Sequence, residues 1–140
     1  MIEIIDSNDS RAIRNKNNVL GFYDLVINQK KSEESVGKFI SPGYIQHNPR
    51  VPQGRDGFKQ FMSRVPGRTP EEIKPEWKNS PVLTLINGPY SFMMWDRTDN
   101  DPSDPTKQYT WNHFDVLRME NGRVKEHWDE AQIMPPPAGN

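Results

Sequence analysis

The first part of the chain carries apolar side chains at spacings of three and four, the period of a helix that packs on a core. The clearest group comprises Val19, Phe22, Tyr23, Val26 and Ile27. This group predicts a helix that begins after the capping residues Ser7-Asn8-Asp9-Ser10 and ends near Ile27. Two further helices are predicted, from Ser32 to a break at Ser41-Pro42-Gly43, and from Gly54 to Arg64.

After Thr69 the pattern changes to an alternation of apolar and polar residues, which predicts β-strands. The predicted strands are Ile73 to Lys78, Val82 to Ile86, Tyr90 to Arg97, Tyr109 to Met119 and Arg123 to Ile133, with a short extended piece at Tyr44 to His47. Asn87-Gly88 and Asn121-Gly122 predict hairpin turns, and Thr98 to Lys107 predicts a polar loop. This order predicts one α+β domain over residues 1–140, a cone-shaped curved antiparallel sheet packed against about three helices, with a frayed tail at 134–140.

The strand from Tyr109 collects ionisable and bulky apolar residues on one face. Its odd positions are Trp111, His113, Asp115, Leu117 and Met119. Because successive side chains of a strand point to opposite faces, these residues share one side of the sheet. An ionisable pair flanked by large apolar groups predicts the wall of a functional cavity.

The turn at Asn121-Gly122 decides which residues of the following strand face this wall. A two-residue loop would place Trp128 opposite Asp115, whereas a three-residue loop ending in Gly122 would place His127 there. We prefer the three-residue loop, which pairs charged residues on both faces and sets Asp129 opposite His113. A slip of one residue would turn His127 away from Asp115.

Composition narrows the class of partner. Apolar residues make only 33% of the chain, but they include six Phe, four Trp and six Met, which suit a cavity for a flat organic molecule. The net charge is −1 and the basic residues are scattered, so we expect no nucleic-acid partner. No apolar run is long enough to cross a membrane and no leader peptide is visible, which predicts a cytoplasmic protein without a membrane partner. The lack of Cys excludes disulfides and thiolate chemistry.

Two motifs stand far apart in the chain. The first is His47-Asn48-Pro49 followed by Val51-Pro52-Gln53-Gly54-Arg55, and the second runs from Phe114-Asp115-Val116-Leu117-Arg118 to Glu126-His127-Trp128-Asp129. Together they resemble the SnoaL-like polyketide cyclase family of the nuclear transport factor 2-like superfamily. The resemblance covers about residues 10–133 and implies a single domain with a cystatin-like cone of curved sheet packed on helices.

For function, the resemblance implies cofactor-free aldol cyclisation by an aspartate acid/base, in a family that also holds isomerases, dehydratases and members without an assigned activity. Asp115 matches the family's acid/base, and His47 and His127 match its motif histidines. One departure lies in the run from Phe92 to Arg97, where Trp95 stands at a site that is often His in related sequences. We therefore expect a more apolar pocket.

The residues themselves also suit proton transfer on a carbonyl compound. Burial among apolar neighbours should raise the pKa of Asp115, and such a carboxylate can remove a proton α to a carbonyl. His127 or His113 would supply the donor for the enolate oxygen. We expect these three residues to be the catalytic residues of a cyclase, isomerase or lyase that uses no metal and no cofactor. The alternative is an Asp–His hydrogen bond that only stabilises the hairpin.

A second set of residues is expected to bind a small apolar or aromatic ligand: His47, Tyr44, Trp95, Trp111, Met119 and Asp129. His47 precedes a Pro turn, so its ring could instead stabilise that loop. A non-catalytic small-molecule binding or assembly module of the same fold is the alternative function.

A metal-dependent enzyme is a further alternative, because His113-Phe114-Asp115 and His127-Trp128-Asp129 each place a His and an Asp on one face of a strand. The helical first half argues against it, since such metal sites usually occur in all-β folds. The opposite face of the sheet carries Phe114, Val116 and Trp128 among polar residues and predicts the surface of a homodimer.

Overall fold

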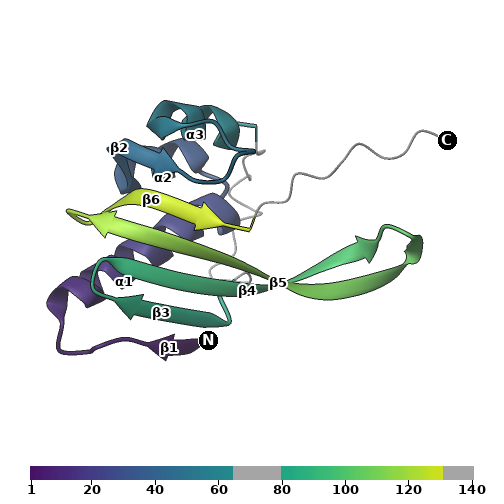
Figure 1. Cartoon of the computed structure of the whole chain (residues 1–140), viewed down its shortest axis with the longest axis horizontal. Helices are drawn as coiled ribbons and strands as arrows, with labels where there is room; N and C mark the ends of the chain where they lie inside the picture. The colour runs from purple at the N-terminus through teal and green to yellow at the C-terminus, as the bar shows by residue number, and fades with distance from the viewer. Residues whose placement is uncertain (65–79, 131–140) are drawn as a thin grey trace.

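The computed structural model describes residues 1–64 and 80–130. The helical elements are α1 (Ser10–Tyr23), the π-helical turn η1 (Asp24–Asn28), α2 (Ser32–Phe39) and α3 (Gly54–Met62). The strands are β1 (Ile2–Ile4), β2 (Ile40–Gln46), β3 (Leu83–Asn87), β4 (Tyr90–Asp101), β5 (Asp104–Glu120) and β6 (Arg123–Asp129). Figure 1 shows the helices together on one face of a twisted sheet.

The sheet has the order β1-β3-β4-β5-β6-β2. Its centre, β3 to β6, is an antiparallel meander, whereas the edge strands β1 and β2 run parallel to β3 and β6. Both edge strands come from the first half of the chain and join the sheet through crossover connections, because parallel strands cannot be joined by a tight hairpin. The α+β prediction is confirmed, with a mixed rather than a wholly antiparallel sheet.

The core forms where α1 meets the inner face of the sheet. The Asp9 side chain accepts hydrogen bonds from the backbone N–H groups of Arg11 and Ala12 and so begins the helix, as the capping pattern predicts. The predicted apolar face of α1 then packs on Trp95 and Leu117, each 1% exposed. No helix of the described ranges, 1–64 and 80–130, is long and apolar enough to span a membrane.

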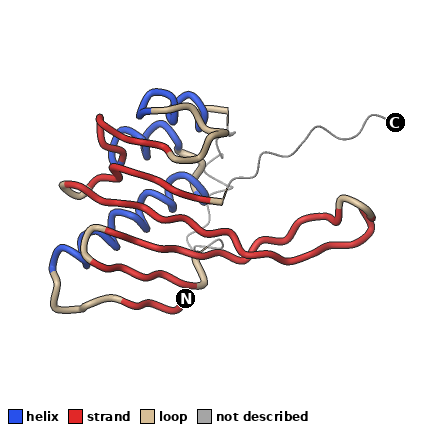
Figure 2. The backbone as a smooth tube through the Cα atoms, in the orientation of Figure 1, coloured by secondary structure: helices blue, strands red, loops and turns tan. Residues whose placement is uncertain are grey.

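Two local predictions are wrong. Ser41-Pro42-Gly43 does not close a helix; α2 ends at Phe39, and these residues belong to β2. Pro42 is compatible with a strand there because β2 lies at the edge of the sheet. Nor is Thr98 to Lys107 a loop, because β4 and β5 continue as a two-stranded arm that projects beyond the other strands, as Figure 2 shows.

Some predictions fall on residues that the structure does not describe. These are the strand Ile73 to Lys78, the end of the last strand beyond Glu130, and the tail at 134–140. The remaining predicted helices and strands are confirmed, with ends that differ by a few residues.

The β5–β6 hairpin adopts neither predicted register. Asn121 and Gly122 have φ angles of 51° and 75° and form a two-residue loop that pairs Glu120 with Arg123. A bulge then follows, because Met119 pairs with Val124 while Arg118 pairs with Glu126, so that Lys125 is the additional residue. Beyond the bulge Asp115 lies opposite Asp129, and the odd-numbered residues of β6 point to the same face as Asp115.

Candidate active site

A cavity of about 500 Å³ lies between the inner face of the sheet and the helices. Its apolar wall comes from α1, η1 and α3 and from the loop before α3: Phe22, Val26, Ile27, Val51, Phe58, Phe61 and Met62. Its polar wall comes mainly from the sheet and the ends of its strands: Gln46, Asn48, Arg50, Arg97, His113, Asp115, His127, Asp129 and Glu130, with Tyr23 from α1. A volume of this size suits a small organic ligand.

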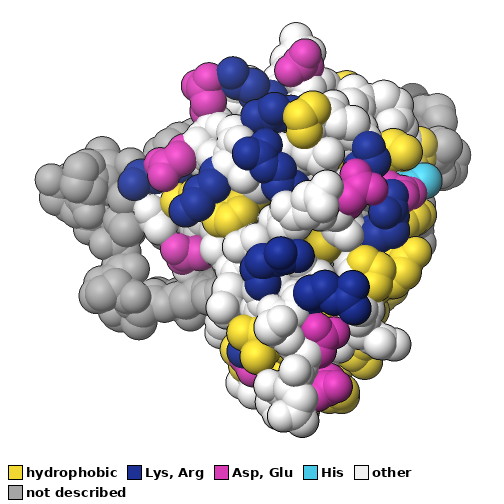
Figure 3. Space-filling view, turned by 90° about the vertical axis from the view of Figure 1, so that its left-hand side faces the viewer, with side chains coloured by type: hydrophobic (Ala, Val, Ile, Leu, Met, Phe, Trp, Pro, Cys, Tyr) yellow, Lys and Arg dark blue, Asp and Glu magenta, His cyan; other side chains and the backbone are white. Residues whose placement is uncertain are grey.

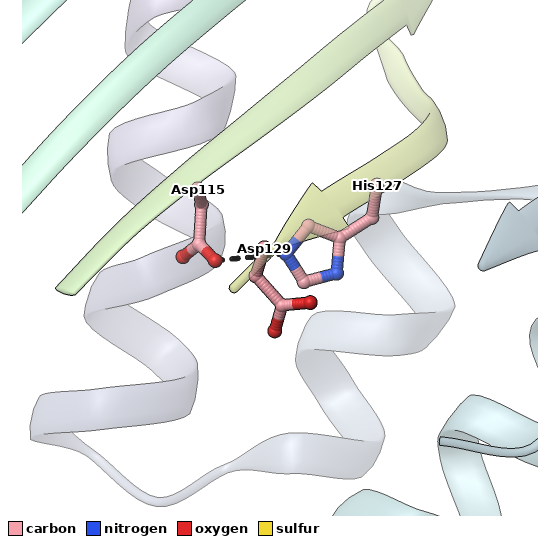
Figure 4. A group of neighbouring side chains, drawn as sticks. All are labelled: Asp115, His127 and Asp129. Carbon is pink, nitrogen blue, oxygen red and sulfur yellow. Dashed lines mark hydrogen bonds and ion pairs between the residues drawn. The ribbon is translucent and has the colours of Figure 1, made fainter. Parts of the chain in front are cut away.

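Asp115 is the centre of the polar wall and is only 3% exposed. Its Oδ2 accepts a hydrogen bond from the Tyr23 hydroxyl at 2.6 Å, and its Oδ1 lies 2.9 Å from His127 Nε2. His113 Nε2 lies 3.4 Å from the same Oδ1. Figure 4 shows Asp115 and His127 joined in this way, with Asp129 beside them.

These partners keep Asp115 ionised. Burial alone would raise the pKa of its carboxyl group, but the hydrogen bonds from His113 and His127, together with the positive charge of His113, outweigh burial and hold the pKa well below its ordinary value. Burial and the charge of Asp115 raise the pKa of the Tyr23 hydroxyl, which therefore remains a donor. The expectation of a raised pKa at Asp115 is wrong, because it considered apolar neighbours and not these donors.

The tautomer of His127 follows from the groups around its Nδ1. The backbone N–H of Asn48 donates to Gln46 Oε1 at 2.9 Å, which turns the Gln46 amide nitrogen toward His127 Nδ1 at 3.1 Å. The same nitrogen donates to the Tyr44 hydroxyl at 2.8 Å. Nδ1 thus faces a donor and accepts a hydrogen bond, so the proton is on Nε2 and is donated to Asp115.

His113 is a cation at neutral pH. Burial alone would lower its pKa, but Asp115 and then Glu130 outweigh burial and raise the pKa of the imidazole to about 9. Glu130 contacts His113 Nδ1 directly and also accepts a hydrogen bond from the Phe114 backbone N–H at 3.2 Å. The site therefore holds an imidazolium between two carboxylates.

Asp129 differs from Asp115 in both environment and basicity. Burial raises the pKa of its carboxyl group above the ordinary value, and the opposing effects of His127 and the Asn48 side chain are smaller. Its Oδ1 is buried and has no hydrogen-bond partner among the described residues. Asp129 is therefore the more basic carboxylate of the pair, and its side chain lines the cavity.

A metal ion does not fit this group well. Single ligand atoms of Asp115, His127 and Asp129 do lie within 4.8 Å of one another. A ligating histidine, however, donates its other ring N–H to an acceptor. Here the Nδ1 of His127 faces the amide nitrogen of Gln46, so its Nε2 carries a proton and cannot ligate.

The predicted substrate-binding residues are dispersed. Trp95 and Met119 are buried in the core, and Tyr44 is buried behind His127 with its hydroxyl 3.3 Å from Nδ1. His47 lies on the outer face of the sheet, where its ring stacks on Trp128 with centroids 4.4 Å apart. Of the six residues, Asp129 lines the cavity. Trp111 stands on the arm, 6.0 Å from the His113 ring between centroids.

Several residues of the site were not predicted. The sequence pattern indicates for Tyr23 only a place on the apolar face of the first helix, and it gives no signal for Gln46, Asn48 and Arg97, which also line the cavity. The period of α1 could have suggested that Tyr23 points inward with a hydroxyl that needs a partner. Nothing in the local sequence around Gln46 signals that its amide fixes a histidine on a strand distant in the sequence.

Comparison with known proteins supports the fold. No protein-family model and no curated protein matches the sequence. Among solved structures, a candidate polyketide cyclase from Bacillus cereus superposes with a TM-score of 0.65 at 19% identity, over 92% of this chain and 83% of that one. A candidate SnoaL-like polyketide cyclase from Jannaschia gives 0.63 at 12% identity, over 90% and 92%. TerC, crystallised with polyporic acid, gives 0.58 at 14% identity, over 84% and 90%.

The chain therefore has the fold of nuclear transport factor 2-like proteins, other members of which are also similar to it in structure. Within that class, the similar structures include candidate SnoaL-like polyketide cyclases. At the level of the fold, this similarity confirms the resemblance that the two motifs indicate.

Proposed function

We propose that the protein is an enzyme that performs cofactor-free acid/base chemistry on a small, largely apolar carbonyl compound, by aldol cyclisation or isomerisation. One observation carries the proposal: a cavity with an apolar wall holds two neighbouring carboxylates whose pKa values are shifted in opposite directions. Environments that separate the pKa values of paired titratable groups are typical of acid/base catalysts.

In this proposal Asp129 is the proton acceptor, in place of Asp115. Its carboxylate, which lines the cavity, removes a proton from the carbon α to the carbonyl group and leaves an enolate. The positive charge of the His113 imidazolium offsets part of the negative charge that develops on the enolate oxygen. The enolate carbon then attacks a second carbonyl, and the new alkoxide takes the proton back from Asp129, so that the enzyme ends as it began.

Asp115 has a positioning role in this scheme. It is already hydrogen-bonded to Tyr23 and His127, and its depressed pKa makes it a weak base. Its charge holds His113 in the imidazolium form and fixes the ring of His127. Two further buried residues, Gln46 and Tyr44, fix the opposite side of that ring.

Exchange of α-protons tests this proposal without knowledge of the natural substrate. The protein would be incubated in D2O with a panel of cyclic ketones and 1,3-diketones, and loss of the α-proton signals followed by NMR. We expect catalysed exchange for at least one compound, and a loss of about 10²–10⁴-fold in Asp129→Asn, the range of general-base contributions. Full exchange activity in Asp129→Asn would refute the assignment of the base.

A non-catalytic binding module is the second candidate. The observation that favours it is the complete hydrogen bonding of the Asp115 carboxylate, which is what a purely structural centre would also show. This candidate predicts compounds that bind in the cavity with no exchange above the buffer rate.

We also propose that the protein is a homodimer that uses the outer face of the sheet. Tyr90 and Phe114 are 47% and 41% exposed there, and the Phe92 and Phe114 rings stack with centroids 5.8 Å apart. Exposed aromatic groups clustered on one face are typical of protein contacts. Figure 3 shows the end of the molecule that carries the β3–β4 and β5–β6 turns, where basic and acidic side chains are interspersed.

A further inference from the structure

Two arginine side chains line the same cavity as the carboxylates. Arg97 lies on β4 opposite Trp111 of β5, so its side chain belongs to the inner face of the sheet, diagonal to His113. Arg50 follows a tight turn in which its backbone N–H donates to Asn48 Oδ1 at 2.8 Å. The two residues thus approach the cavity from the sheet and from the loop before α3.

Neither guanidinium group is neutralised by the described part of the chain. Among residues 1–64 and 80–130, no carboxylate lies within ion-pair distance of Arg50 or Arg97, although Asp129 and Glu130 line the same cavity. Arg118, on the outer face, is by contrast paired with Glu126 at 2.5 Å. A guanidinium group presents a planar set of donors that matches a carboxylate, and no carboxylate of the described ranges occupies that set at either position.

The charged groups of the cavity lie at different depths. Asp115 is buried, Asp129 and Arg97 are half-buried, and Arg50 is exposed, so the positive charge extends nearer to the solvent than the buried carboxylate. Both ring nitrogens of His113 already contact carboxylates, whereas no carboxylate of the described ranges pairs with Arg97 or Arg50, so these two arginines can bind an anionic group of a ligand. A ligand whose reacting carbon reaches Asp129 would extend its other end toward these arginines.

We propose that the cavity takes a flat carbonyl compound that carries an anionic group, of the carboxylate type, and that Arg97 and Arg50 bind this group. The inference rests on the proposed function, because it treats the cavity as the substrate site. It adds a chemical class: the substrate is amphiphilic, with an apolar ring system against the helices and an acid at the solvent end. Arg97 and Arg50 then determine specificity for the acid over its neutral ester or amide.

A matched pair of fluorescent dyes tests the proposal directly. The dyes 8-anilinonaphthalene-1-sulfonate and N-phenyl-1-naphthylamine share a ring system and differ by one anionic group. We expect Arg97→Gln to weaken binding of the sulfonate dye about 10-fold, the effect of losing one charge-assisted hydrogen bond, and to leave the neutral dye within about 2-fold. Arg50→Gln should act in the same direction, and Arg97→Lys should restore part of the loss.

Arg123→Gln is the control variant, because Arg123 is exposed at the start of β6, outside the lining of the cavity. It should leave both dyes unaffected. Shifts of the backbone amide NMR signals of Asn48, Val51 and Arg97 on addition of the sulfonate dye would show that it occupies this cavity. The proposal is overturned if neither dye binds, if the neutral dye binds and the sulfonate dye does not, or if Arg97→Gln affects the two dyes equally.

The outcome is separable from that of the exchange assay. A protein that shows the sulfonate-specific effect but catalyses no proton exchange would lose the proposed function and keep a ligand site for acids. A protein that catalyses exchange while Arg97→Gln and Arg50→Gln leave dye binding unchanged would keep the proposed function and lose the acid-binding role.

Discussion

Asp115→Asn tests whether the centre of the polar wall is an ionised carboxylate. The substitution keeps the shape of the side chain but removes the charge that compensates the His113 imidazolium. It also places an amide N–H where either Tyr23 or His127 already presents a donor. At most one of those two hydrogen bonds can then remain without rearrangement.

The expected loss of stability follows from these contacts. A hydrogen bond to a charged group contributes about 1.5–3 kcal/mol, and removing one partner of a buried ion pair costs about 3–5 kcal/mol. Because Asn keeps one acceptor, we expect Asp115→Asn to lower the free energy of unfolding by about 3 kcal/mol at pH 7. The folded-state pKa of Asp115 is depressed, so its contribution is present above the unfolded-state pKa and is lost as the pH falls through the folded-state value.

Asp129→Asn is the matched control. Its Oδ1 has no partner and its pKa is raised by burial, so its ionisation at pH 7 costs stability and the substitution removes that cost. We expect a change within about 1 kcal/mol of wild type, or a gain. Urea unfolding followed by tryptophan fluorescence measures both variants. Equal effects of the two substitutions, or a loss below about 1 kcal/mol for Asp115→Asn, would refute the different protonation states assigned here.

Further predictions concern titration, backbone conformation and assembly. The pKa of His113 is raised to about 9 from 6.5, so its contribution to stability is complete below pH 6.5 and is lost as the pH rises toward 9. After discounting for the partial exposure of the ring, this contribution to the free energy of unfolding is about 1–2 kcal/mol. His113→Asn should flatten that part of the pH dependence of urea unfolding. Gly122→Ala should lower the free energy of unfolding by about 1–2 kcal/mol, because φ is 75° and an added Cβ would lie 3.0 Å from Asn18 Nδ2. Gly37→Ala in α2 is the contrasting substitution: its Cβ would meet no atom within 4 Å, and it should raise the free energy of unfolding by about 0.5 kcal/mol. Phe114→Lys should convert a dimer to a monomer in sedimentation equilibrium without loss of thermal stability; an unchanged mass would exclude the outer face as the contact.

The alternation of residues in the second half of the chain predicts the strands and the inner face of β5, because that signal is local. The register of β6 could not be predicted in the same way. It depends on the bulge at Lys125, one extra residue that no turn or glycine marks in the sequence. The contact between Asp115 and His127 is found in the structure although the register predicted for it is wrong: the two residues are diagonal neighbours rather than opposite ones.

The protonation state of Asp115 could not be predicted from the sequence for a different reason. Burial among apolar residues predicts a raised pKa, but His113 on the same strand and His127 on β6 donate to the carboxylate and outweigh burial. That both rings turn toward Asp115 depends on the packing of the folded sheet. The arm was missed because Thr98 to Lys107 is polar and contains two Pro, and its strands pair with each other without a core to bury. The strands of the arm depend on pairing with each other, and their polar, Pro-containing composition alone is typical of a loop.

The bulge at Lys125 determines what chemistry the cavity can hold. With the two-residue turn at Asn121-Gly122 and no bulge, Asp115 would lie opposite Trp128, and the even-numbered residues of β6 would point inward. His127 and Asp129 would then lie on the outer face, away from Asp115. One inserted residue exchanges the two faces of β6 and so brings the imidazole and the second carboxylate to the inner face, while Trp128 goes outside to stack on His47. The proposed acid/base pair and the outer contact of Trp128 with His47 are therefore consequences of the same local irregularity in the hairpin.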